Sequence, residues 1–223
     1  MTSAVCCSDV SRPEASGDAP NPDRRGVLAA AAAAAAAASG LPPVAKDAAA
    51  QAAPSAPAPR MARPAVGDVL VFAAGEKAGK PIGPSDLEPG GPQVLAWAME
   101  PASGVVRNGS RLNQVLLLRL DPAALDEATG SRSAEGVVAY SAVCTHAQCP
   151  VSEWRREAGI LHCPCHQSEF DPKQGGKVVG GPAQRPLAAL PVKLGEGASG
   201  AAEGGGVLVV ARQFVGRIGA SSS

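Results

Sequence analysis

Short apolar runs recur along the chain from about residue 66 onward, and glycine, proline or aspartate separates each run from the next. The runs are rich in valine and leucine, which favours short strands joined by turns over long helices. The sequence therefore predicts an all-β fold, a mainly antiparallel sandwich or barrel. The expected strands are Val69–Phe72, Val94–Met99, Val115–Leu120, Val137–Val143, Lys177–Val179, Leu187–Val192 and Val207–Val210.

One short segment of this region has helix-forming features instead. Residues 122–127 begin with proline, which is favoured at the first helical position, and Asp121 precedes them as an N-cap. Two other segments are expected at the surface. The glycine-rich stretch 196–206 is interpreted as a mobile hairpin loop, and Arg155-Arg156 as part of a solvated loop.

The N-terminal part of the chain has a different composition. Arg24 and Arg25 precede an alanine-rich apolar stretch from Val27 to about Val44, which resembles a twin-arginine export signal. The stretch is about as long as a bilayer crossing requires, roughly 20 residues, so a removed signal and an uncleaved membrane anchor both remain open. The alternative is an alanine tract with two incidental arginines.

Residues 46–65 are dominated by alanine and proline and have no apolar periodicity, as in a proline-stiffened tether. We therefore expect residues 1–45 to be a signal or anchor, residues 46–65 a linker, and residues 66–220 one folded domain.

Charge and composition narrow the range of functions. The 20 Lys and Arg residues balance the 20 Asp and Glu residues, so nothing indicates the basic face of a nucleic-acid-binding protein. Aromatic residues make up 3% of the chain, so valine, leucine and alanine must form most of the core. The chain has 3 histidines, and two of them lie within a group of cysteines.

This group consists of two segments, Cys144-Thr145-His146 and, further on, Cys163-Pro164-Cys165-His166. Two thiolates and two imidazoles can bind zinc tetrahedrally, or an iron–sulfur cluster in which two histidines replace two cysteines on one iron. Zinc fingers usually take two cysteines from one segment and two histidines from the other, whereas here each segment offers one of each. The residue types alone leave both metals open.

The two segments resemble the cluster-binding boxes of the Rieske proteins, in the branch with a bridging disulfide that includes the cytochrome bc1 and b6f subunits and the arsenite oxidase small subunit. The resemblance implies one [2Fe–2S] cluster per chain and a Rieske-type antiparallel β sandwich with a small cluster-binding subdomain. It extends to residues 180–183, which look like the proline loop that covers the cluster. The site residues that it implies are Cys144, His146, Cys163 and His166 as ligands, Cys149 and Cys165 as the disulfide, and Ser168, Phe170 and Pro182 around the cluster.

The chain departs from the family pattern at three positions. The family usually has Leu or Met followed by Gly where this chain has Ala147 and Gln148, and Gly where it has Gln167. Because glycine is favoured where φ is positive, Gln148 predicts a changed backbone angle in the first box. Ala147 removes a bulky apolar residue and so puts the family's usual docking surface for a quinol-binding partner in question.

Two side chains after the second box bear on the reduction potential. Ser168 stands where the family places a hydroxyl that donates to a cluster sulfide and raises the potential. Where the bc1 proteins usually have a tyrosine as a further donor, this chain has Phe170. We therefore expect a potential below that of a typical bc1 Rieske protein.

The resemblance implies one-electron transfer, as the iron–sulfur subunit of a respiratory or periplasmic complex of the quinol–cytochrome c reductase type. The expected partners are a cytochrome b or a molybdopterin subunit, and a c-type cytochrome or similar acceptor. One alternative is the small subunit of a molybdenum oxidase such as arsenite oxidase, which Phe170 favours. The other is a structural zinc-binding module.

The expected location is the periplasmic side, soluble or membrane-anchored, and the isolated chain is not expected to be a self-sufficient enzyme.

Overall fold

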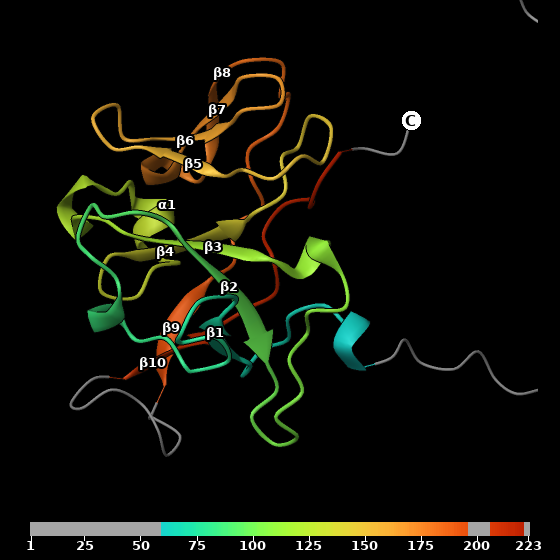
Figure 1. Ribbon diagram of the computed structural model, residues 1–223. Helices are drawn as coiled ribbons and strands as arrows, with labels where there is room; N and C mark the ends of the chain where they lie inside the picture. Colours follow the sequence, from blue (N-terminus) through green and yellow to red (C-terminus); the bar gives the residue numbers. More distant parts are fainter. Residues whose placement is uncertain (1–58, 196–205, 221–223) are drawn as a thin grey trace, which may run out of the picture. The chain divides into compact units, whose positions relative to one another are not determined.

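The computed structural model describes residues 59–195 and 206–220, which form two β-sheets (Figure 1). All pairs of neighbouring strands in these sheets are antiparallel, as the sequence predicts. The larger sheet has six strands in the order β4-β3-β2-β1-β10-β9, with bounds β1 (Val69–Phe72), β2 (Val94–Met99), β3 (Val115–Arg119), β4 (Val137–Ser141), β9 (Val192–Gly195) and β10 (Val207–Val210). The smaller sheet has four strands in the order β5-β6-β7-β8, with bounds β5 (Glu153–Arg155), β6 (Ile160–Cys163), β7 (Ser168–Asp171) and β8 (Lys177–Gly180).

The expected signal, most of the expected linker and most of the glycine-rich stretch lie outside the described residues. Within residues 59–195 and 206–220, no helix has the length and apolar character that crossing a membrane would require. The domain boundaries remain predictions.

The predicted strands of the larger sheet agree with the structure except near the C-terminal end. Within residues 187–190, Ala189 alone forms isolated bridges, to Tyr140 and Val215, and β9 begins at Val192. The reason is that Pro186 and Pro191 have no N–H group to donate to a ladder. The prediction also missed β5, β6 and β7, which are three or four residues long and lie next to or within the second cysteine box.

The helix expected at residues 122–127 is split into two turns. Asp121 accepts a hydrogen bond from Ala123 N, as an N-cap should, but this turn is a 3₁₀ helix that ends at Ala124. Asp126 then caps a second turn, α1 (Glu127–Gly130). Four further 3₁₀ turns cover Pro59–Met61, Pro84–Asp86, Arg111–Asn113 and Pro172–Gln174.

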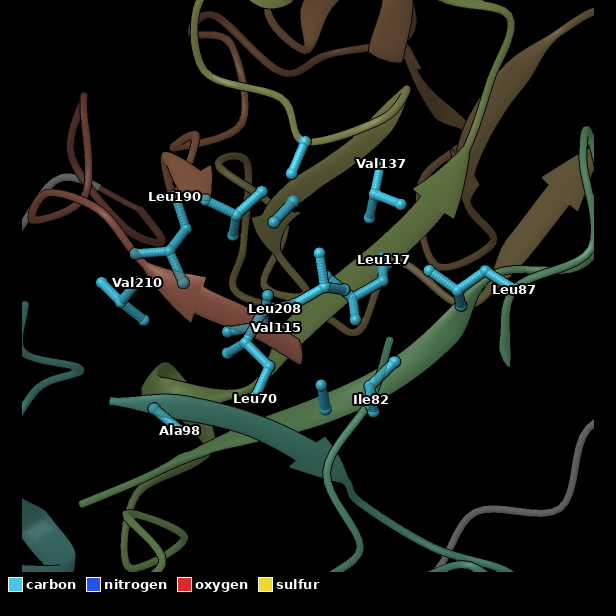
Figure 2. Close-up of a cluster of buried hydrophobic side chains, with 14 residues drawn as sticks. Leu70, Ile82, Leu87, Ala98, Val115, Leu117, Val137, Leu190, Leu208 and Val210 are labelled. Carbon is cyan, nitrogen blue, oxygen red and sulfur yellow. The ribbon is translucent and has the colours of Figure 1, made fainter. Parts of the chain in front are cut away.

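The apolar core of the larger sheet draws on all six of its strands (Figure 2). Along β3, Val115 and Leu117 enter this core, whereas Leu116 and Leu118 belong to a second apolar cluster that includes Leu161 of the smaller sheet. Both faces of β3 are therefore buried, which explains why it reads as an uninterrupted apolar run. Each fully buried leucine contributes about 1.5–3 kcal/mol to stability.

The larger sheet curls until its ends come together. Leu190 N donates to Ala139 O at 2.9 Å, and Ser141 N donates to Ala188 O at 2.8 Å. The segment before β9 is thus hydrogen-bonded to β4, the strand at the opposite end of the sheet.

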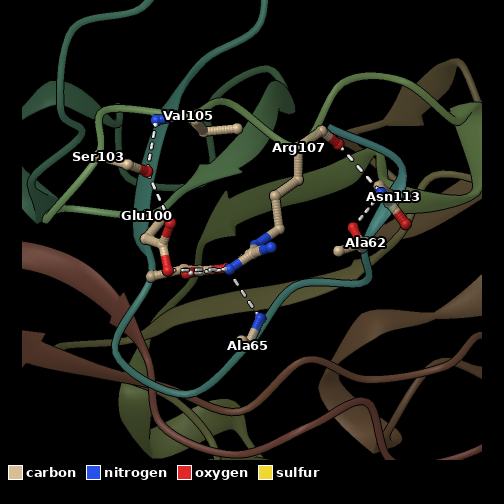
Figure 3. Close-up of polar contacts among 8 residues, drawn as sticks. Ala62, Ala65, Glu100, Ser103, Val105, Arg107 and Asn113 are labelled. Carbon is tan, nitrogen blue, oxygen red and sulfur yellow. Dashed lines mark hydrogen bonds and ion pairs between the residues drawn. The ribbon is translucent and has the colours of Figure 1, made fainter. Parts of the chain in front are cut away.

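The chain segment before β1 is held by a polar group around a buried ion pair (Figure 3). Arg107 donates to both carboxylate oxygens of Asp68, at 2.6 and 3.1 Å, and the carboxylate raises the pKa of the guanidinium. Asn113 Nδ2 donates to Arg107 O at 3.1 Å and to Ala62 O at 2.7 Å. Residue 62, expected in the linker, is therefore fixed to the domain.

Polar contacts join the smaller sheet to the rest of the domain. Trp154 of β5 donates its indole N–H to Gly90 O at 3.1 Å. Tyr140 of β4 donates its hydroxyl to Pro172 O at 2.7 Å, just after β7. These bonds fix the smaller sheet on the outer face of β3 and β4.

Candidate metal centre

The first loop of the site, residues 144–149, begins soon after β4. Cys144 N donates to Cys149 O at 2.8 Å, and Gln148 N donates to Cys144 O at 3.1 Å, so the loop closes on itself. Gln148 has a φ of 58°. The expectation of a changed backbone angle is therefore wrong: the glutamine adopts the left-handed conformation that glycine favours.

The second loop, residues 163–168, joins β6 to β7 and pairs Cys163 with Ser168. Cys163 and Ser168 are buried, whereas the residues between them are exposed, including His166. Gln167, which also replaces a glycine of the family pattern, has a φ of 62°. The hairpin therefore keeps a left-handed turn directly after His166.

The four predicted ligands converge between the two loops. The ring centroids of His146 and His166 are 4.7 Å apart, and the rings meet at 79°. Cys144 and Cys163 are free thiols, each 1% exposed. Burial raises the pKa of Cys163, and the neighbouring Cys144 raises it further. This burial disfavours the thiolate form of Cys163 unless a bound metal supplies compensating charge.

A disulfide between Cys149 and Cys165 joins the loops, with 6.4 Å between the Cα atoms, and this pairing was implied by the family resemblance. The sulfurs of Cys149, Cys163 and Cys165 lie within 4.8 Å of one another, close enough to hold a metal ion. However, the two bonded sulfurs cannot act as thiolates, and thiolates are the metal ligands. Among the described residues, Cys144 and Cys163 remain as thiol donors.

Two buried polar atoms in this region have no hydrogen-bond partner among the described residues: His146 Nδ1 and Ser168 Oγ. An unpaired buried polar atom costs about 1–3 kcal/mol, so each needs an explanation. If a metal ion is bound, His146 Nδ1 would donate its lone pair to it. A sulfide would accept a hydrogen bond from Ser168, whereas a zinc ion brings no acceptor of its own.

The residues present therefore fit a [2Fe–2S] cluster with two cysteine and two histidine ligands. The donor set, the buried thiols and the unpaired hydroxyl all agree with it. Phe170, fully buried in β7, offers no further donor.

The proline loop lies against both cluster loops. Gly181 has a φ of 75°, and a Cβ there would collide with Gln167 O and lie 2.6 Å from Ser168 Cα. Pro182 and His146 line the same cavity of about 180 Å³. Only glycine allows this close approach to the second loop.

Sequence reasoning gave no role to the third histidine, His162. It precedes Cys163 in β6, is 2% exposed, and lies 3.0 Å from the side chain of Gln167. Arg155, expected in a solvated loop, is instead part of β5 and reaches His162 at 3.0 Å. The signal that could have found this group is the strand alternation that puts residues 153 and 155 on one face.

The end of the described chain also reaches the site. Arg185 Nη2 donates to Gly219 O at 2.7 Å, and Thr145 Oγ1 donates to Arg185 O at 2.6 Å. Gly219 lies so close to Gln148 that a Cβ would come within 3.1 Å of its side chain. The first loop is thus supported by residues far from it in sequence, which no sequence pattern indicated.

Comparison with known proteins gives a family match to the Rieske [2Fe–2S] domain over residues 113–191, a range that includes both boxes. The chain is 35% identical over 122 residues to the cytochrome bc1 complex Rieske iron–sulfur subunit of Streptomyces lividans, covering 52% of this chain and 70% of that protein. It is 32% identical over 143 residues to the subunit of the same name from Mycobacterium tuberculosis, covering 56% of this chain and 33% of that protein.

A Haloferax mediterranei protein, named as a candidate Rieske subunit of a respiratory nitrate reductase, is 54% identical over 59 residues, 26% of each chain. Among solved structures, the plasma membrane Rieske protein PetC3 from Synechocystis is 23% identical, with a TM-score of 0.31, and the match covers 52% of this chain and 84% of that one. The chain thus spans most of the Streptomyces lividans protein but about a third or less of the Mycobacterium and Haloferax proteins. With 35% identity over 70% of a curated Rieske subunit and a matching family domain, the chain belongs to the Rieske [2Fe–2S] family.

Proposed function

We propose that this protein is a one-electron carrier whose [2Fe–2S] cluster is held by Cys144, His146, Cys163 and His166. The observation that carries the proposal is their convergence on two disulfide-joined loops, with His146 Nδ1 buried and unpartnered among the described residues. Bound there, the cluster supplies a centre that takes up and releases a single electron.

The chain's own residues set how readily that electron is held. Neutral imidazole brings less negative charge than thiolate, so two histidines raise the potential above that of an all-cysteine cluster, to about −150 to +300 mV in Rieske centres. The buried Ser168 hydroxyl adds a donor, and Phe170 adds none. Ser168→Ala should lower the potential and Phe170→Tyr should raise it, as measured by redox titration.

Electron exchange with a partner depends on which ligand the partner can approach. His166 is exposed, whereas both thiols are buried. His166 is therefore the proposed point of contact, and in quinol-oxidising members of the family the equivalent histidine meets the quinol.

The favoured setting is a quinol–cytochrome c reductase, with cytochrome b and a c-type cytochrome as partners. It is supported by relatives from Streptomyces, Corynebacterium and Mycobacterium that are named cytochrome bc1 complex Rieske iron–sulfur subunits. The second candidate is the Rieske subunit of a molybdenum oxidase such as arsenite oxidase, favoured by Phe170 and by a relative named for another oxidoreductase. Co-purification from the native membrane, followed by identification of a cytochrome b or a molybdopterin subunit, distinguishes the two.

The proposed location is the periplasmic side of the membrane, after export by the twin-arginine route. The supporting observation is the Arg24-Arg25 pair before an alanine-rich stretch. Replacing both arginines by lysine should retain the protein in the cytoplasm. Release of the unmodified protein by a salt wash would count against a membrane anchor.

The cluster is tested by metal and acid-labile sulfide analysis of the freshly isolated full chain, together with its EPR spectrum after reduction. We expect iron and sulfide in equal amounts and a Rieske-type spectrum. Cys144→Ser should abolish both, while the matched control Cys6→Ser, outside the predicted domain, should keep them. Zinc in place of iron would instead establish the structural zinc module.

A further inference from the structure

We infer that Gln167 is a positioning residue for the second ligand loop, and that it acts by linking the Pro164 carbonyl to the buried ring of His162. The inference rests on the proposed binding of the cluster by this loop. We call these contacts, with Glu153 and Arg155, the His162 brace.

The ring of His162 is the fixed centre of the brace. It is 2% exposed, and both of its nitrogens have partners. Nδ1 donates to Glu153 Oε2 at 2.7 Å. Nε2 lies 3.0 Å from Gln167 Oε1, to which it can donate, and 3.0 Å from Arg155 Nη2, from which it can accept, so it makes one of these two hydrogen bonds at a time. Because a buried polar ring that loses its partners is penalised, these contacts hold its orientation.

The carboxamide of Gln167 connects this ring to the loop backbone. Its Nε2 donates to Pro164 O at 2.9 Å, so one side chain spans the turn and also contacts His162. Gln167 has a φ of 62°, a conformation that residues other than glycine rarely adopt. The two side-chain contacts offset this backbone cost and select the left-handed turn.

The brace extends across three strands of the smaller sheet. Arg155 of β5, which contacts His162 of β6, also donates to Glu169 Oε1 of β7 at 2.6 Å. Gln167 is therefore tied to β6 through His162, next to the Arg155–Glu169 ion pair that links β5 to β7. Since it lies between His166 and Ser168, losing the brace would free both the ligand and the hydroxyl donor.

The chain offers an internal control for backbone conformation. Gln148, in the first loop, has a φ of 58°, almost the same as Gln167. Within residues 59–195 and 206–220, its side chain makes no hydrogen bond, unlike that of Gln167. Replacing either glutamine by glycine relieves the same backbone strain. Gln148→Gly removes only packing against Gly219, whereas Gln167→Gly removes the side-chain contacts to Pro164 and His162.

The experiment compares Gln167→Gly and Gln148→Gly in the full chain loaded with its cluster. The measurements are iron release to a chelator, reduction potential and the EPR g-values. We expect Gln167→Gly to release iron about 10-fold faster, the usual size for loss of an outer-shell partner, and to have a lower potential. Gln148→Gly should release iron no faster than the unmodified protein. Equal behaviour of the two variants would overturn the inference.

If Gln167→Gly does not fold, Gln167→Asn serves instead, because asparagine tolerates the left-handed conformation but is too short to reach both partners. It should also release iron faster, and combining it with His162→Phe should add nothing to His162→Phe alone. Fully additive effects would refute the brace. An unmodified protein without iron would refute the proposed function instead, so the two failures are distinguishable.

Discussion

The two sheets of this protein are stabilised by different kinds of contact. In the larger sheet, apolar side chains fill both faces of β3 and β4, and Figure 2 shows the cluster on one of these faces. In the smaller sheet, the strands have three or four residues, and a disulfide, ion pairs and a buried histidine hold much of the structure around the ligands.

This difference indicates that the larger sheet provides most of the stability of the fold, whereas the smaller sheet fixes the positions of the cluster ligands. Apolar contacts are numerous and non-directional, so they supply free energy without dictating the position of any one atom. Hydrogen bonds, ion pairs and disulfides have restricted geometry, so they can hold ligands in place. Disturbing the larger sheet should therefore lower global stability, whereas disturbing the smaller sheet should alter the metal centre first.

The largest effect is expected from Leu117→Ala in the core of the larger sheet. Leu117 is fully buried, and its truncation should lower the free energy of unfolding by about 2–5 kcal/mol. Urea unfolding followed by circular dichroism measures the loss. Leu95→Ala in β2, where the side chain is 38% exposed, is the matched control and should cost about 1 kcal/mol or less. A changed EPR spectrum in the folded Leu117→Ala variant would contradict the view that the larger sheet affects global stability and not the metal centre.

The next effect is expected from removing the disulfide with Cys149→Ser and Cys165→Ser. A crosslink that closes a loop of about 15 residues contributes about 3 kcal/mol, and this one joins residues 16 apart. Amide exchange should accelerate in residues 144–149 and 163–168 before it does in β1 or β2. Unchanged cluster stability and potential would show that the disulfide does not clamp the loops.

Tyr140→Phe tests the junction between the sheets. The change removes the hydrogen bond to Pro172 O and should cost about 0.5–1.5 kcal/mol, measured by urea unfolding at neutral pH. The packing of the ring is conserved. A loss above the range expected for one hydrogen bond would mean that the hydroxyl also orders the smaller sheet.

The same tyrosine predicts a pH dependence. Burial raises the pKa of Tyr140 above its ordinary value of about 10. Its contribution to stability is therefore complete below the pKa of the unfolded state, and is lost as pH rises from there towards the folded-state pKa. Unfolding at pH 8 and pH 11 should show this loss, and Tyr140→Phe should reduce it. The chain has 1 tyrosine, so its absorbance change reports Tyr140 directly.

The smallest effect is expected from Arg156→Ala. Arg156 pairs with Glu88 at 3.0 Å, but the two side chains are 56% and 62% exposed, so the loss should be about 0–1 kcal/mol. The neighbouring variant Arg155→Ala should do more to iron retention, because Arg155 contacts the buried His162. If Arg155→Ala and Arg156→Ala changed iron retention equally, the His162 brace would matter no more to the metal centre than an exposed ion pair does.

The fold class, most strands of the larger sheet and the proposed ligands could be predicted from local residue order. The apolar residues 115–118 predict a strand directly, because a strand with both faces buried needs apolar residues at successive positions. The cysteine and histidine spacing carries the family resemblance within two short segments. These features depend on neighbours in sequence.

Other features depend on contacts between residues that sequence order does not relate. The left-handed conformation of Gln148 beside Gly219, the breaking of the run after residue 187 and the brace around His162 belong to this group. A polar side chain in a short strand has no periodic signal that names its partner. Once such a side chain is buried, its role depends on the group with which it forms a hydrogen bond or ion pair. That group is brought next to it only by the tertiary structure.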